Sequence, residues 1–167
     1  MEHKIYIKEV QNESDFKAAK ELILEYVTWL GIDSDSKVIA TLKSQNFDKE
    51  MNSLPETYGK NDGRLFIALT NGKVVGVAGI KRFNETECEV KRMYIQPESR
   101  GLGIGKLLLN SCIEMAKTLN YTSIKLDTTS YMKSAIKLYT ENGFVEISAY
   151  RHNPHDQARF FELNLLK

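Results

Sequence analysis

The sequence predicts an α/β fold in which strands and helices alternate along a chain of 167 residues. Three observations predict it. Short runs rich in β-branched and aromatic residues alternate apolar and polar side chains, which is typical of strands. Longer runs repeat apolar residues every three to four positions, as amphipathic helices do. Between two β-rich runs stands Asn71-Gly72, a pair that favours a tight hairpin turn because it tolerates positive φ angles.

The first half of the chain begins with an alternating strand and a helix that opens at Ser14 and is closed by Gly31. A second, more polar helix follows, and then a turn-rich loop that leads into the hairpin. The expected ranges are strand 4–10, helix 14–30, helix 37–51, loop 52–63 and hairpin strands 64–70 and 73–82.

The second half continues the alternation after a third sheet-forming run. Its glycine-rich segment is followed by an apolar helix, a strand, a helix stopped by Gly143 and two terminal strands. The expected ranges are strand 88–95, helix 103–119, strand 123–128, helix 132–142 and strands 144–150 and 158–166. No repeat or linker interrupts the chain, so we expect one domain over residues 1–167.

Composition restricts the class of partner. The 23 basic and 22 acidic side chains nearly cancel, which argues against nucleic acid or an anionic membrane as the main partner. Cys88 and Cys112 are too few and too far apart for a disulfide framework, and the first residues lack an apolar signal core. No apolar run approaches the roughly 20 residues needed to span a bilayer. We therefore expect a cytoplasmic protein with a small ligand.

Three glycines, Gly101, Gly103 and Gly105, stand between an apolar strand and an apolar helix. A P-loop would need four residues between its glycines and a Ser or Thr after the lysine; here three residues intervene and Leu107 follows Lys106. A Rossmann fingerprint would need a glycine where Lys106 stands, although Asp127 at the end of the next strand keeps a dinucleotide site as an alternative.

A third interpretation is a turn that directs backbone N–H groups and the positive end of a helix at a pyrophosphate. The residues Arg100-Gly101-Leu102-Gly103-Ile104-Gly105 resemble the acyl-CoA motif of the GNAT superfamily of acetyl-CoA-dependent N-acyltransferases. The resemblance covers about 110 of the 167 residues in order, from Tyr58 to the end. Residues 58–83 resemble the second and third strands, 89–109 the fourth strand and CoA helix, and 126–144 the fifth strand and next helix.

The resemblance implies a mixed, mostly antiparallel sheet that is splayed between its fourth and fifth strands and flanked by helices, with acetyl-CoA as cosubstrate in the splay. The fourth strand carries the Lys-Arg-x-Tyr of one branch, here residues 91–94. Met132 departs from many members, which have an asparagine there for a pantetheine hydrogen bond. The implied cofactor-binding residues are Met93, Tyr94, Ile95, Arg100, Gly101, Leu102, Gly103, Ile104, Gly105, Lys106, Ser134 and Tyr139.

Acyl transfer to an amine needs a neutral nucleophile and a protonated leaving group. An alkylamine has a pKa of about 10.4 and a thiol one of about 8.5, so a base and an acid both help. The resemblance implies that Tyr139, four residues before Gly143-Phe144, points at the CoA sulfur as the acid; its helical spacing alone would make it a core residue. Glu89 is the candidate base, directly or through a water, with Glu87 on the same strand face; both also fit solvated surface positions.

The oxyanion needs a fixed donor, and the resemblance places a β-bulge N–H for it near residues 93–95. Arg92 would either hold an acceptor carboxylate or lie in solvent. Neither cysteine looks like an activated thiolate, which favours direct attack over a covalent route. The two histidines of "HNPHD" (152–156) lack a third ligand at a recognised spacing, so we expect no metal.

The expected function is transfer of an acetyl group from acetyl-CoA to a primary amine of a small metabolite: an amino acid, a polyamine or a xenobiotic amine. Acetylation of a protein N-terminus or lysine, and an acyl-CoA sensor without catalysis, remain alternatives. We expect the first two helices and the loops 83–87 and 151–157 to build the acceptor pocket. A homodimer through the later strands is implied by the resemblance alone.

Overall fold

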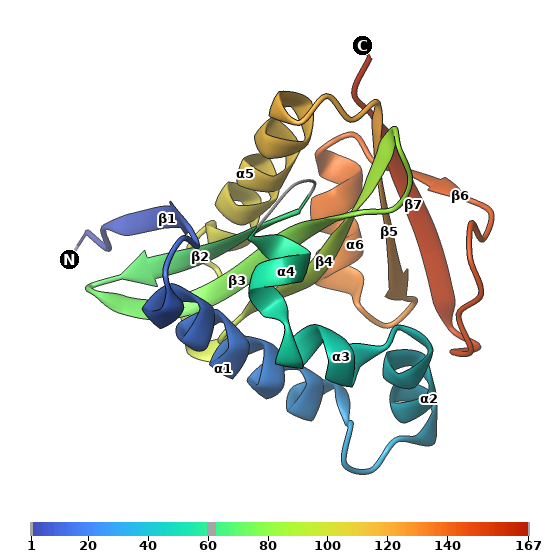
Figure 1. Cartoon of the computed structure of the whole chain (residues 1–167), viewed down its shortest axis with the longest axis horizontal. Helices are drawn as coiled ribbons and strands as arrows, with labels where there is room; N and C mark the ends of the chain where they lie inside the picture. Colours follow the sequence, from blue (N-terminus) through green and yellow to red (C-terminus); the bar gives the residue numbers. More distant parts are fainter. Residues whose placement is uncertain (1, 60–62, 167) are drawn as a thin grey trace.

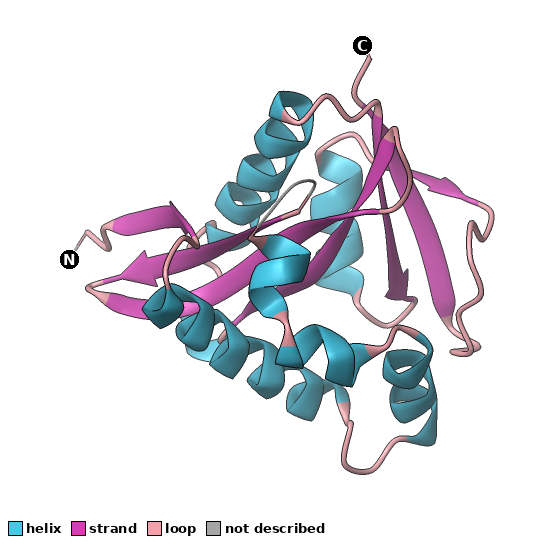
Figure 2. Ribbon diagram, viewed as in Figure 1, coloured by secondary structure: helices cyan, strands magenta, loops and turns pink. Residues whose placement is uncertain are grey.

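A computed structural model describes residues 2–59 and 63–166 and contains one twisted sheet with helices on both faces (Figures 1 and 2). The strand order within the described residues is β1-β2-β3-β4-β5-β7-β6, and all neighbours are antiparallel except β4 and β5. The predicted mixed, mostly antiparallel sheet is therefore confirmed. The strands are β1 (Ile5–Glu9), β2 (Arg64–Thr70), β3 (Lys73–Arg82), β4 (Glu87–Ile95), β5 (Ser123–Thr129), β6 (Val145–Ile147) and β7 (Ala158–Asn164).

The helices differ in length and in how they end. Helix α1 is capped at its start by the Asn12 side chain, which accepts from the Asp15 N–H at 2.9 Å, and at its end by Gly31 at φ 107°. The helices are α1 (Glu13–Leu30), α2 (Ser36–Ser44), α3 (Phe47–Asn52), α4 (Leu54–Tyr58), α5 (Ile104–Thr118) and α6 (Lys133–Glu141), with a 3₁₀ turn at Pro97–Ser99. No helix in the described part of the chain is long and apolar enough to cross a bilayer.

The hairpin of β2 and β3 has the predicted bounds. Asn71 and Gly72 form its turn with φ angles of 51° and 77°, the conformation that this pair favours. The alternation of β2 then separates two cores. Phe66 and Ala68 face α5, whereas Leu65 and Ile67 face the layer of α1 to α4. Figure 1 shows α1 and α4 on one face of the sheet and α5 on the other.

The helix predicted over 37–51 is wrong in one respect, because the chain breaks it at Asn46. That residue has φ 55°, and it separates α2 from α3. Buried residues Val38 and Leu42 precede the break and Phe47 and Met51 follow it, so the spacing of apolar residues hides the change in direction. The predicted loop 52–63 also contains the short helix α4; its residues 60–62 lie outside the described residues.

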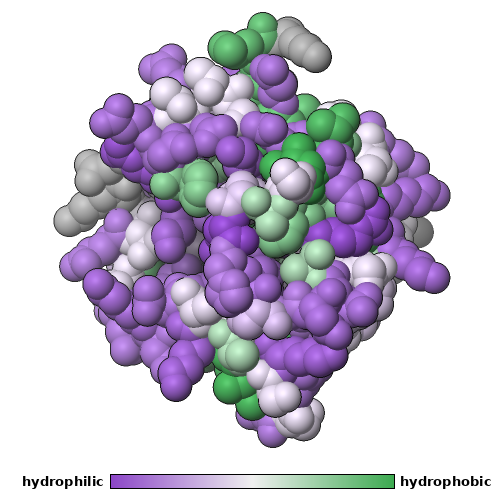
Figure 3. Space-filling view, turned by 90° about the vertical axis from the view of Figure 1, so that its right-hand side faces the viewer, coloured by the Kyte–Doolittle hydropathy of each residue, from purple (hydrophilic) through white to green (hydrophobic). Residues whose placement is uncertain are grey.

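The terminal strands are shorter than predicted. Only Val145–Ile147 of the range 144–150 joins the sheet, at the edge formed by β6. The face of the molecule that carries this edge is mainly hydrophilic, with small separate apolar patches (Figure 3). The single domain over 1–167 and the homodimer through the later strands stay predictions.

Candidate active site

The sheet opens between β4 and β5. The two strands pair in parallel only where Glu87–Glu89 meets Ser123–Lys125, and beyond those residues they diverge. The edge of β4 that faces β5 therefore has no strand partner from Val90 to Ile95 in the described structure. A row of backbone N–H and C=O groups without a strand partner is a surface to which an extended ligand can pair as another strand would.

A β-bulge lies in the middle of this open edge. Val77 pairs with Tyr94 and Gly79 with Lys91, so Arg92 and Met93 together oppose one residue of β3. Arg92 has φ 59°, a left-handed conformation that costs a non-glycine residue roughly 1–2 kcal/mol. The bulge thus begins one residue before the predicted range 93–95. The bulge lies within the stretch of β4 that has no strand partner on its β5 side in the described structure.

The glycine segment has the geometry of an anion cradle. Gly101 and Gly103 have φ angles of 82° and 80°, and a Cβ added at either one would meet no heavy atom within 4 Å. The turn is therefore open to a ligand at both positions. The Leu107 N–H donates to the Gly103 carbonyl at 3.2 Å, so the amides of residues 104–106 precede the hydrogen-bond ladder of α5. These residues fit a pyrophosphate at a helix N-terminus.

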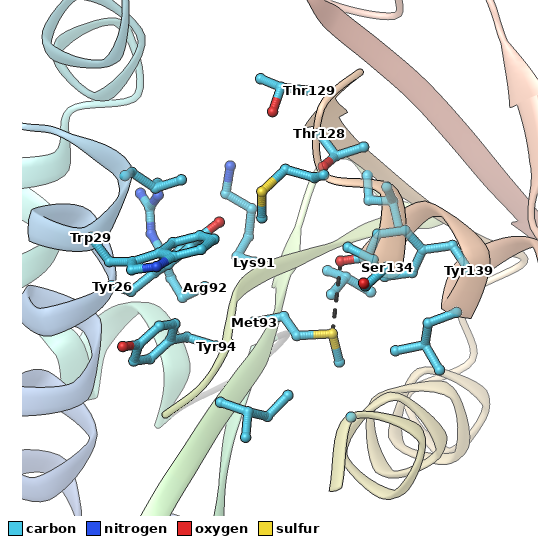
Figure 4. A pocket seen from close by; sticks show the side chains of 18 of the residues that line it. Tyr26, Trp29, Lys91, Arg92, Met93, Tyr94, Thr128, Thr129, Ser134 and Tyr139 are labelled. Carbon is cyan, nitrogen blue, oxygen red and sulfur yellow. Dashed lines mark hydrogen bonds between the residues drawn. The ribbon is translucent and has the colours of Figure 1, made fainter. Parts of the chain in front are cut away.

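A cavity of about 740 Å³ joins the open strand edge, the glycine turn and the helices on either side (Figure 4). Residues from α1 and α2 form one wall, and the start of α6 with the end of β5 forms the other. Of the residues that the sequence singled out for the cofactor, eleven line this cavity: Met93, Tyr94, Ile95, Arg100, Gly101, Gly103, Ile104, Gly105, Lys106, Ser134 and Tyr139. Leu102 is the exception; its exposed side chain stands outside the cavity lining.

Tyr139 enters the cavity from α6 and points toward the bulge. Its hydroxyl donates to the Met93 sulfur at 3.7 Å, the dashed line in Figure 4. Only 6% of the residue is exposed, and burial raises the pKa of its phenol above the usual value. The group therefore keeps its proton at neutral pH, as a general acid must.

Arg92 is neither in solvent nor free to hold a substrate carboxylate. Its guanidinium donates from Nε to Glu50 Oε2 at 2.8 Å and from Nη2 to Glu50 Oε1 at 3.3 Å, and both residues are buried. The Phe47 ring lies 5.0 Å from the guanidinium carbon. Arg92 therefore neither binds an acceptor carboxylate nor lies in solvent. Its role is structural, because the ion pair with Glu50 fixes the strained residue at the bulge to α3.

Glu89, the candidate base, is buried away from the cavity. Its carboxylate accepts from the Tyr150 hydroxyl at 2.7 Å and lies 3.4 Å from Arg151 Nε. Arg151 also binds Asp127 at 2.9 Å. Burial tends to raise the pKa of Asp127, but Lys91 and Arg151 hold it below its usual value. Glu87 meets Lys125 at 2.9 Å, so both glutamates hold the closed end of the splay together rather than facing solvent.

We expect Glu89→Gln to lower stability more than turnover. The amide keeps an acceptor for Tyr150 but loses its charge attraction to Arg151, so the free energy of unfolding should fall by about 1–2 kcal/mol. Turnover should stay within roughly tenfold of the wild type, since a general base contributes about 100-fold or more. Urea unfolding and initial rates measure the two effects. A loss of 100-fold in kcat at unchanged stability would restore Glu89 as the base.

Both cysteines and His155 of the HNPHD segment are buried. Cys88 and Cys112 are fully buried, and burial raises the pKa of Cys88 to about 12. His155 is buried too; its Nδ1 accepts from the Gln157 N–H at 3.1 Å, and its Nε2 lies 3.3 Å from the Tyr131 hydroxyl. No group of three or more His, Cys, Asp or Glu residues in the described chain could hold a metal.

The wall of the cavity formed by α1 holds residues that the sequence did not single out. Tyr26 and Trp29 lie three residues apart on α1, and their rings and that of Tyr94 form one aromatic cluster in which Tyr26 and Tyr94 are 5.3 Å apart. Arg100 stacks on this cluster 4.9 Å from the Trp29 ring and donates to the Ile95 carbonyl at 3.0 Å. The spacing of Tyr26 and Trp29 was the available signal, but it equally fits packing in a core.

The two loops predicted to build the acceptor pocket differ in whether they line the cavity. Asn153 and His155 from the loop 151–157 line the cavity together with α1 and α2. No residue of the loop 83–87 lines it. That loop lies at the closed end of the splay, where Thr122 N–H donates to the Thr86 carbonyl at 2.7 Å.

The fold and the cavity define a CoA-dependent acyltransferase, and comparison with known proteins agrees. The model of the Acetyltransferase (GNAT) family matches residues 34–144, and the chain belongs to this family. It is therefore an acetyltransferase with acetyl-CoA as its cosubstrate.

Relatives and solved structures extend the likeness over nearly the whole chain. An uncharacterized N-acetyltransferase of Schizosaccharomyces pombe is 33% identical over 165 residues, which cover 98% of this chain and 96% of the relative. The crystal structure of a GNAT-family acetyltransferase from Staphylococcus aureus Mu50 has a TM-score of 0.77 and 27% identity, covering 97% and 99% of the two chains. The PaiA N-acetyltransferase from Thermoplasma acidophilum in complex with coenzyme A has a TM-score of 0.72 and 18% identity, covering 96% and 99%.

Proposed function

We propose that this chain acetylates the primary amine of a small metabolite by direct attack of the amine within a ternary complex. The observation that carries the proposal is the single cavity in which the open edge of β4, the glycine turn and the Tyr139 hydroxyl meet. Helices α1 and α2 close the acceptor side of this cavity. A wall of helices admits a small amine more readily than a folded protein, which supports a metabolite as the acceptor.

Two parts of the chain would bind different parts of the cosubstrate. Residues 101–106 fit the pyrophosphate at the start of α5, and the open edge of β4 fits the amides of the pantetheine arm. When bound, acetyl-CoA supplies an activated acyl carbonyl and a thiolate leaving group. Met132 lines the cavity at the start of α6, beside Ser134, and offers no side-chain amide there. Binding of the arm then relies on backbone groups.

Two groups act on the reacting atoms in this proposal. The backbone N–H groups at the bulge of Arg92 and Met93 stabilise the oxyanion, because they are fixed before the reaction and need no reorganisation. The Tyr139 hydroxyl protonates the departing thiolate.

The proposal is tested first by ligand-dependent stability. Thermal unfolding with acetyl-CoA or CoA at 100 times its dissociation constant should show about 2.7 kcal/mol of added stability. NAD and ATP under the same conditions should add none. Thiol release is then measured with a panel of amines. Stabilisation by NAD or ATP alone would support the dinucleotide alternative. Stabilisation by acetyl-CoA without thiol release on any amine would support a sensor.

A further inference from the structure

The cavity contains a buried cation, Lys91, that forms no ion pair within the part of the chain that the structure describes. Lys91 is 6% exposed, and its Nζ reaches the neutral Gln45 Oε1 at 3.3 Å. In residues 2–59 and 63–166, no carboxylate oxygen lies within 4.0 Å of this ammonium. Figure 4 shows the side chain between the aromatic residues of α1 and the Thr128–Thr129 end of β5, pointing into the open space.

The neighbouring buried charges are all paired, which sets Lys91 apart. Arg92 has Glu50 at 2.8 Å, and Arg151 has Asp127 at 2.9 Å and Glu89 at 3.4 Å. Gln45 cannot serve Lys91 alone, because its Oε1 also accepts from Arg92 Nη1 at 3.0 Å. Burial and the adjacent Arg92 guanidinium lower the pKa of Lys91 to about 8, so the side chain is mostly charged at neutral pH.

A buried charge normally has an ionic partner, because an unpaired one loses its hydration without compensation. Here an anionic partner has room to enter, since Lys91 lines the cavity. The Asp127 carboxylate lines it too, but Arg151 and Asn153 Nδ2 already bind that carboxylate, each at 2.9 Å. The position also suits a substrate group. Lys91 lines the same cavity as Arg92 and Met93 of the bulge, so a group bound to Lys91 shares that cavity with the proposed oxyanion donors.

We infer that Lys91 binds the carboxylate of the acceptor and that the acceptor is an amino acid rather than a polyamine or a simple amine. This inference rests on the proposed function. The side chain of the amino acid would pack against the Tyr26 and Trp29 rings and against Val38 and Leu42 of α2, which share the cavity wall. The Thr41 hydroxyl and Asn153, 3.4 Å apart, add neutral polar groups at that wall.

The test compares amino acids with their own decarboxylated amines. Initial rates of thiol release from acetyl-CoA are measured for the twenty protein amino acids and, where one exists, the amine that lacks only the carboxylate. At least one amino acid should have a kcat/KM about 100-fold above that of its amine, because a site built for a polar group rejects an analogue without it. In Lys91→Met the kcat/KM for that amino acid should fall to within about threefold of the value for its amine.

Lys117→Met is the matched control, because it removes an exposed lysine of α5 that does not line the cavity. It should leave the preference intact. Lys91→Met should also melt at a higher temperature than the wild type at pH 7, since it removes an unpaired buried ammonium. A lost preference in a stabilised protein then reflects binding and not misfolding.

Several outcomes overturn the inference. They are equal rates for amino acids and amines in the wild type, no thiol release with any amino acid, and an equal loss for both classes in Lys91→Met. The stabilisation by acetyl-CoA, measured in the same preparations, separates this failure from failure of the proposed function. Stabilisation by acetyl-CoA with amines turned over as efficiently as the matching amino acids overturns only the role of Lys91. No stabilisation by acetyl-CoA overturns both.

Discussion

Tyr139→Phe is expected to lower kcat for acetyl transfer about 100-fold while leaving the affinity for acetyl-CoA within a factor of about three. A positioned general acid contributes roughly that much to the rate, and the phenyl ring preserves the packing against Phe144 at 5.8 Å. Steady-state thiol release gives kcat, and ligand-dependent melting gives the affinity. Tyr6→Phe is the matched control, since that exposed ring of β1 does not line the cavity and should change neither value.

The pH profile gives a second measure of the same group. An acid is active only while protonated, so its contribution is lost as pH rises through its pKa. Burial raises the pKa of Tyr139 above its usual value of about 10, so kcat should show no alkaline decline from this residue below about pH 10. Equal kcat values for the wild type and Tyr139→Phe would contradict the assignment.

Glu50→Ala is expected to reduce the free energy of unfolding by about 3–5 kcal/mol, the largest stability effect we predict. The substitution leaves the Arg92 guanidinium buried without its carboxylate, and an uncompensated buried charge is costly. Urea unfolding measures the loss. Acetyl transfer should also weaken, because the same ion pair holds the left-handed residue at the bulge to α3.

A double variant separates the charge from the packing. Arg92→Met combined with Glu50→Leu removes both charges and should recover most of the lost stability, since apolar replacement of a whole buried pair is often neutral. Its turnover should stay low, because the side chain that anchored the bulge to Glu50 is gone. If Glu50→Ala alone cost less than about 1 kcal/mol, the anchoring role of the pair would be wrong.

Local patterns in the sequence predicted most of the fold. The turn Asn71-Gly72 placed both strands of the hairpin, and Gly31 marked the end of α1, because each depends on a conformation that few residues adopt. The break at Asn46 was not predictable in the same way. Apolar residues continue at helical spacing across it, and only tertiary packing decides that the chain turns there.

In the site, too, local features were predictable from the sequence and long-range contacts were not. The glycine turn is contiguous in the chain, so its residues were identifiable together. The pair of Arg92 and Glu50 spans 42 residues, and that of Tyr150 and Glu89 spans 61, so no local pattern announces either contact. Glu89 therefore looked available as a base although the fold had already given it two partners. Lys91 was not predicted as a binding residue, because its distinguishing feature is a neutral partner at a buried position, and this is visible only in the folded structure.

Among the described residues, three pairs form the ladder between β4 and β5, whereas seven form the ladder between β5 and β7. The backbone of the segment from β5 to β7 is thus hydrogen-bonded to the rest of the sheet over only a short stretch. In the proposed complex the pantetheine arm of acetyl-CoA pairs with the open edge of β4. Its binding should therefore slow hydrogen exchange at the amides of residues 90–95, and the release of CoA should restore the faster exchange. The rate at which CoA leaves and the rate at which the sheet opens between β4 and β5 are then coupled. A substitution that strengthens the contacts between the two strands at Glu87 should therefore also slow product release.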